Sequence, residues 1–318
     1  MGVECGLNPV EDRTENKEVA MITTQLRNGF VALIVCLFSA ASVYAQTTNS
    51  MASDDNWTNA VAWSLGHVPS GTEAAEIQAG VIANAYRCRE TNDFAGNLIL
   101  REGAQLVIDD YSSNDFRDFI PADTNSAIYL YNGSLLKVFD GGGVAMPNPL
   151  VVDGAVTLEK GSSFNSGDWL INGIISGAGS VTYAFKSGTH PQREIFLNPP
   201  ADCTYSGGAT IINTSGIDQR VVVYANKVFG TGNVTISTNA TVVLNSGSTP
   251  DVIDDSAALY IEGSGLLNLG SNNEQVFQCY IDGIKQPDGD YTSAQSWLVG
   301  TGTLTVKGSP SGTVMIIK

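Results

Sequence analysis

The chain has 318 residues, a formal net charge of −16, and charged side chains at only 15% of its positions. Its 34 glycines and its 43% of hydrophobic residues argue against a helix-rich fold and against global disorder. The negative charge argues against nucleic acid and anionic lipid as partners.

The first 45 residues indicate export. Arg27 precedes an apolar run over residues 29–45 that ends in small side chains, which is the pattern of a secretory signal peptide. We expect cleavage after Ala45 and a secreted or surface-held mature protein with no membrane span. The alternative is a membrane anchor, but the run is at or below the roughly 17–20 residues that cross a bilayer. Because residues 1–20 are polar and charged, Met21 competes with Met1 as the true start.

The mature chain holds three cysteines, Cys88, Cys203 and Cys279, whose spacing fits no zinc site. An exported protein can join two of them in a disulfide. Buried single thiols are the alternative.

Residues 46–96 are expected to form an N-terminal cap and the first turns of the fold. Trp57 and Trp63 lie close together in a turn-rich segment that continues into a loop at His67. Two large aromatic side chains can cover the first edge of a stack of strands. The alternative interpretation is a sugar-binding platform.

Short strands separated by turn residues fill residues 97–307, and residues 308–318 are expected to form a tail with one last strand. Each segment alternates apolar and polar residues, so apolar side chains share one face. The expected strand segments are 98–108, 127–138, 150–164, 168–183, 193–197, 203–236, 240–244, 258–269, 275–283, 302–306 and 313–317.

A glycine followed by alternating residues recurs with loose spacing. The interval is 21 residues from Gly133 to Gly154 and 25 from Gly154 to Gly179. Spacing in the low twenties suits one turn of a β-solenoid. A β-sandwich would use about seven strands in about 100 residues, whereas this chain has many more without a linker. We therefore predict an all-β protein: a single right-handed parallel β-helix (β-solenoid) with an N-terminal cap.

Three segments resemble the autotransporter-associated β-strand repeat of secreted bacterial β-helix proteins: TYSGGATI (204–211), VFGTGNVTI (228–236) and residues 280–306. The resemblance covers residues 180–306 well and 97–180 only in general style. It implies a right-handed β-helix that is exported to the cell surface or beyond, and it implies no particular reaction. Only KGSPSGTVMIIK follows Val306, so we expect no translocator barrel and no self-translocation.

Histidine chemistry is not indicated, because His67 and His190 lie far apart in the sequence. Aspartates offer a better metal site. The loop DDYSSNDFRDFIPAD carries Asp109, Asp110, Asp115 and Asp118, and clustered carboxylates are ligands for Ca²⁺. The alternative is that these aspartates stabilise solvated turns.

Tyr129 and Tyr131 alternate with Leu130, so both phenol rings are expected on one face of a strand, as a ligand platform or as an aromatic ladder. We expect a non-enzymatic structural or adhesive module that contacts extracellular glycans or surface proteins. The alternative is a polysaccharide lyase or hydrolase, or a carbohydrate-binding module, on the same scaffold. Carboxylates converging with an Arg or Lys on one outer sheet would favour the enzyme.

Overall fold

The computed structural model describes residues 46–86, 94–109, 120–139, 144–161, 167–186, 194–245 and 251–308. The chain divides into two units, Met1–Gln46 and Thr47–Lys318, and the fold described here belongs to the second. The described part is all β apart from one short 3₁₀ turn, η1 (Ala60–Ala62). It contains no helix with the length and apolar character needed to cross a membrane.

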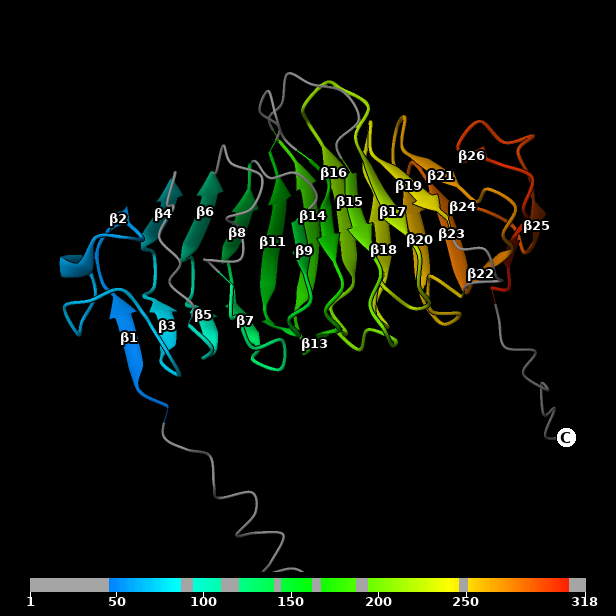
Figure 1. Cartoon of the computed structure of the whole chain (residues 1–318). Helices are drawn as coiled ribbons and strands as arrows, with labels where there is room; N and C mark the ends of the chain where they lie inside the picture. The colour runs from blue at the N-terminus through cyan, green and yellow to red at the C-terminus, as the bar shows by residue number, and fades with distance from the viewer. Residues whose placement is uncertain are drawn as a thin grey trace, which may run out of the picture. The chain divides into compact units, whose positions relative to one another are not determined.

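The strands form three large sheets and one small one, in which strands from successive turns of the chain lie side by side (Figure 1). The six-stranded sheet consists of β1 (Thr48–Met51), β3 (Ala74–Ile77), β5 (Leu98–Leu100), β7 (Ile128–Tyr131), β10 (Leu150–Asp153) and β13 (Ile175–Ser176). The eleven-stranded sheet consists of β2 (Asp55–Asn56), β4 (Ile82–Tyr86), β6 (Gln105–Asp109), β8 (Leu135–Val138), β11 (Ala155–Lys160), β14 (Ser180–Phe185), β16 (Ala209–Asn213), β18 (Val234–Ile236), β20 (Ala258–Ile261), β23 (Gln278–Ile281) and β24 (Ile284–Lys285).

The other two sheets come from later parts of the chain. The seven-stranded sheet consists of β9 (Val144–Met146), β12 (Trp169–Ile171), β15 (Glu194–Leu197), β17 (Arg220–Val223), β19 (Thr241–Leu244), β21 (Leu266–Asn268) and β26 (Leu298–Val299). The three-stranded sheet consists of β22 (Glu274–Val276), β27 (Leu304–Val306) and β25 (Gly289–Tyr291). Neighbouring strands are parallel, except that β24 pairs antiparallel with β23 and β25 pairs antiparallel with β27. The prediction of a parallel β-solenoid is therefore confirmed.

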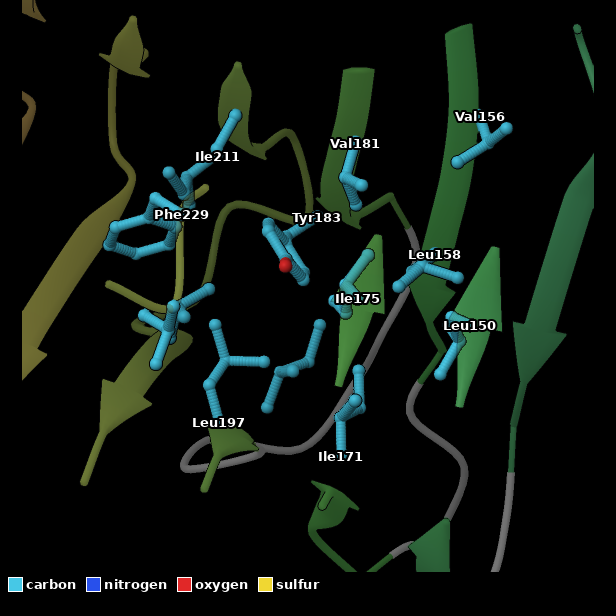
Figure 2. Close-up of a cluster of buried hydrophobic side chains, with 14 of the residues drawn as sticks. Leu150, Val156, Leu158, Ile171, Ile175, Val181, Tyr183, Leu197, Ile211 and Phe229 are labelled. Atoms are coloured by element: carbon cyan, nitrogen blue, oxygen red, sulfur yellow. The ribbon is translucent and has the colours of Figure 1, made fainter. Parts of the chain in front are cut away.

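Alternation along each strand creates the core. In β16 every second side chain is buried, beginning with Ala209, and in β7 Ile128 and Leu130 are buried while the tyrosines between and after them are only half-buried. Figure 2 shows inward side chains meeting from three sheets: Leu150 from the six-stranded, Val181 from the eleven-stranded and Leu197 from the seven-stranded sheet. Each fully buried aliphatic side chain contributes about 1.5–3 kcal/mol.

Aromatic side chains close the N-terminal end of the stack. The Trp57 and Trp63 rings pack edge to face with centroids 4.9 Å apart, and Phe94 lies 5.9 Å from Trp57. The indole Nε1–H of Trp63 donates to the Trp57 carbonyl at 2.8 Å. Both tryptophans are buried, with exposed fractions of 0% and 3%. They cover the first turns and are not available as a sugar platform.

The six-stranded sheet stops at β13, whereas the eleven-stranded sheet continues. In the next turn the chain still stacks on β13, since the Thr204 amide donates to the Ile175 carbonyl at 2.9 Å and the Ser206 amide to the Gly177 carbonyl at 3.1 Å. That segment is not a strand. The outer surface of the solenoid therefore changes shape at β10 and β13.

Cys203 and Cys279 are buried free thiols. Burial raises the pKa of Cys203 to about 11 and that of Cys279 to about 12, so both stay protonated at neutral pH. The Cys203 sulfur accepts a hydrogen bond from the Ile175 amide at 3.3 Å. Cys88 lies outside the described residues.

Candidate functional site

The outer face of the six-stranded sheet carries the two tyrosines that the sequence singled out. Register places Tyr129 between Ile99 and Val151, and Tyr131 opposite Asp153. Since Ile128 and Leu130 of the same strand point into the core, both phenol rings are on the outside. The prediction that they share one outer face thus agrees with the register and the burial pattern.

A depression of about 260 Å³ lies on this face, between the tyrosines and the end of the sheet. It is smaller than the roughly 300–1,000 Å³ of drug-sized ligand sites, so it suits a single ring or a small group. The residues that line it come from β7, β10 and the turn after β13, and they are Tyr129, Leu130, Tyr131, Val151, Val152, Asp153, Gly177 and Ala178.

Gly177 lines the depression in the turn after β13, where the six-stranded sheet ends. Its φ of +113° is a conformation that side chains disfavour, and a Cβ there would lie 2.1 Å from the Val152 carbonyl oxygen. The backbone therefore approaches β10 closely only because position 177 has no side chain. This approach gives the depression its shape.

An ion pair between Arg101 and Glu76 lies next to Tyr131. The Arg101 guanidinium lies 5.1 Å from the centre of the Tyr131 ring and donates from Nε to the Glu76 carboxylate. The bond to Glu76 raises the pKa of Arg101, so this cation is permanent and already paired. The Glu76 carboxylate also accepts a hydrogen bond from the Ser50 hydroxyl at 3.4 Å.

Asp153 is the acid of the depression. Its side chain is exposed, and no hydrogen bond or ion pair joins it to another residue in the part of the chain that the structure describes. The depression thus combines two aromatic rings, apolar walls and one unpaired carboxylate.

The predicted calcium loop is not placed. Asp109 ends β6, where it pairs with Tyr86, and its side chain is outside the described set. Asp110, Asp115 and Asp118 also lie outside the described residues. Among those that are described, no group of three His, Cys, Asp or Glu side chains is arranged to hold a metal ion. Calcium binding stays a prediction.

A second outward row lies on the eleven-stranded sheet. The sequence predicted outward rows of Thr, Ser and Asn, but it did not show which residues align. Register aligns four threonines from successive strands and then two stacked tyrosines. The signal was present, because the threonine follows the first inward valine or alanine of each repeat. The row consists of Thr157, Thr182, Thr210, Thr235, Tyr260 and Tyr280.

Ion pairs also lie away from the depression. The Lys137 ammonium lies 2.6 Å from the Glu159 carboxylate and 4.2 Å from the centre of the Phe139 ring, and Glu159 is only 3% exposed. In the N-terminal loop, His67 Nε2 lies 3.0 Å from the Glu73 carboxylate. His190 lies outside the described residues, so the structure does not place the two histidines relative to each other.

One carboxylate cluster has shifted acidities. The Lys227 ammonium lies 3.6 Å from Asp251 and 3.4 Å from Asp254. Burial raises the pKa of Asp251 and raises that of Glu274 to about 8. Burial also tends to raise the pKa of Asp254, but hydrogen bonds from Ser256 and the nearby Lys227 ammonium outweigh it and hold that pKa below its ordinary value. The cluster therefore holds carboxyl groups of different acidity beside a lysine.

A scan of protein-family models, a search of curated proteins and a search of solved structures each found no match to this chain.

Proposed function

We propose that the chain is an exported, non-enzymatic β-solenoid that acts as a structural or adhesive module at the cell surface or outside the cell, where it contacts glycans. The observation that carries this proposal is the outward pair Tyr129 and Tyr131 beside an apolar depression. Aromatic and apolar walls with a few polar groups are typical of sites for small ligand groups.

The sequence supports the location. Residues 1–45 read as a signal peptide, and the repeats within 180–306 resemble the autotransporter-associated β-strand repeat of exported bacterial β-helices. The row of threonine hydroxyls on the eleven-stranded sheet adds a second surface, on which hydrogen-bonding groups repeat at the spacing of adjacent strands, roughly 4.8 Å.

A glycan array combined with a polysaccharide-degradation screen, each with and without calcium, tests the proposal. We expect binding without release of product, and loss of binding when both tyrosines are changed to leucine (Y129L/Y131L). A matched control is Tyr224→Leu, because Tyr224 is 40% exposed and directly follows β17 of the seven-stranded sheet, outside the lining of the depression. Binding that survives Y129L/Y131L would remove this face from the proposal.

The second candidate is a polysaccharide-active enzyme. The cluster of Lys227, Asp251 and Asp254 with Glu274 favours it, since a carboxyl with a raised pKa beside an ionised one is the usual arrangement of an acid and a base. Release of reducing or unsaturated ends that stops in Glu274→Gln would establish this function in place of the adhesive one.

A further inference from the structure

We propose that the depression beside Tyr129 and Tyr131 recognises a protonated primary amine, and that its ligand is a glycan with free amino groups. This inference rests on the proposed glycan contact and specifies its chemistry. The structural reason is that two aromatic rings and the unpaired Asp153 carboxylate line one small hollow.

The Tyr131 ring already attracts a cation on its other side. The Arg101 guanidinium lies 5.1 Å from the ring centre, approaching from β5, while the depression lies toward β10 and β13. An aromatic face attracts ammonium groups through its quadrupole, and the attraction grows when the site excludes water.

The charges around the hollow favour an incoming cation. Arg101 is paired with Glu76, so those two charges cancel, and Asp153 leaves one net negative charge at the depression. The chain beyond residue 45 carries a formal charge of −14, because residues 1–45 hold five acidic and three basic residues. A negative protein attracts cationic polymers and repels anionic ones, and the attraction weakens with added salt.

A neutral sugar fits the lining less well. Since the Leu130 and Val152 side chains are buried, the outward side chains that line the hollow are those of Tyr129, Tyr131, Val151, Asp153 and Ala178. Among them, polar atoms occur only at Asp153 and at the two phenol hydroxyls. Uncharged polar groups of a ligand would find no partner on the Val151 and Ala178 side chains. An ammonium group needs only one carboxylate and aromatic faces.

The test compares two probes that differ at their amino groups, which are free and cationic in a glucosamine oligosaccharide and acetylated and uncharged in its fully N-acetylated counterpart. Both are titrated calorimetrically into the full chain at mildly acidic pH, below the ordinary pKa of an aliphatic amine. We expect roughly tenfold tighter binding of the free-amine probe, and an affinity that falls with salt. Asp153→Asn should remove that preference.

Matched variants make the outcomes decisive. Asp218→Asn changes an exposed carboxylate next to the seven-stranded sheet and should leave the preference intact. Equal binding of the two probes would overturn the amine inference while leaving the glycan proposal standing. If D153N and D218N weaken amine binding equally, the probe adsorbs through the general negative charge of the protein, and the amine inference is overturned. If neither probe binds but the glycan array shows other ligands, only the amine inference is overturned. If the array shows no ligand at all, the proposed function fails as well.

Discussion

The rings of Tyr260 and Tyr280 stack with their centroids 4.8 Å apart and their planes within 8° of parallel. The two residues pair across β20 and β23, and the Tyr280 hydroxyl donates to Gln278 at 2.8 Å. They extend the threonine row and support the last parallel turns of the eleven-stranded sheet. Aromatic pairs of this kind contribute about 0.5–1.5 kcal/mol beyond the area they bury.

A double-mutant cycle measures the contribution of the stack. Tyr260→Ala, Tyr280→Ala and the double variant should show a coupling free energy of about 0.5–1.5 kcal/mol in urea unfolding. The control cycle couples Tyr260 to Tyr224, which directly follows β17 of the seven-stranded sheet, and should give a value near zero. Equal coupling in the two cycles would contradict the assignment.

Glu274 should make stability depend on pH. Its carboxylate accepts the Val252 amide at 3.0 Å, and burial raises its pKa from 4.5 to about 8. The folded state thus holds the proton more tightly than the unfolded one. The stability it contributes is fully present below pH 4.5 and is lost as pH rises through about 8.

Thermal unfolding between pH 4.5 and pH 9 checks this sign. Glu274→Gln should flatten the decline and should lower stability at acid pH by about 1–3 kcal/mol. The reason is that the Val252 amide and the Gln275 amide, the latter at 3.2 Å, each donate to a different oxygen of Glu274, and the side-chain nitrogen of Gln cannot accept. Glu262→Gln, at an exposed position, is the control. A wild-type protein that grows more stable above pH 7, relative to E274Q, would contradict the prediction.

Gly177→Ala should distort the depression. The substitution places a methyl group against the Val152 carbonyl and adds a side chain at positive φ, so we expect a loss of about 2–5 kcal/mol. Gly216→Ala also has positive φ, at +76°, but meets nothing within 4 Å, so it isolates the conformational cost of about 1–2 kcal/mol. Similar losses for the two variants in urea unfolding would show that the close approach to β10 is unimportant.

Trp63→Phe should weaken the N-terminal end. It removes the indole N–H that satisfies the buried Trp57 carbonyl, which costs about 1–3 kcal/mol. Tryptophan fluorescence during unfolding measures the loss. Val61→Ala, 84% exposed in η1, should change stability by less than about 0.5 kcal/mol.

The calcium prediction has its own measurement. If residues 109–118 bind Ca²⁺, a free concentration about one hundred times the Kd should stabilise the protein by about 2.7 kcal/mol. Changing Asp110 and Asp115 to Asn should remove the effect, while Asp202→Asn should not. If calcium does not change the unfolding midpoint of the wild type or of either variant, these aspartates are turn residues and not calcium ligands.

The repeating pattern was enough to predict the class of fold and the outer position of Tyr129 and Tyr131. Alternation has a period of two, so it assigns each side chain to a face from local sequence alone. It does not say which strands become neighbours. The Tyr260–Tyr280 stack and the partnership of Tyr131 with Arg101 depend on register between turns about 20–30 residues apart, which varying turn lengths conceal.

The depression was harder to foresee for the same reason. It lies where the six-stranded sheet stops after β13, and residues 175–180 read in sequence like any other turn of the repeat. The close approach of Gly177 to Val152 is a contact between turns and leaves no local pattern. The tryptophans were recognisable as a cap because large aromatics near an exposed strand edge need burial.

The reversal at β24 limits how copies of this protein can assemble. β24 is only two residues long and forms the last strand of the eleven-stranded sheet. It pairs antiparallel with β23, with Ile284 opposite Ile281. A second molecule that docked its first parallel turn there would meet a strand running the wrong way. Lengthwise fibre growth by continuing the parallel register is therefore blocked at this edge, although Ile284 remains 69% exposed.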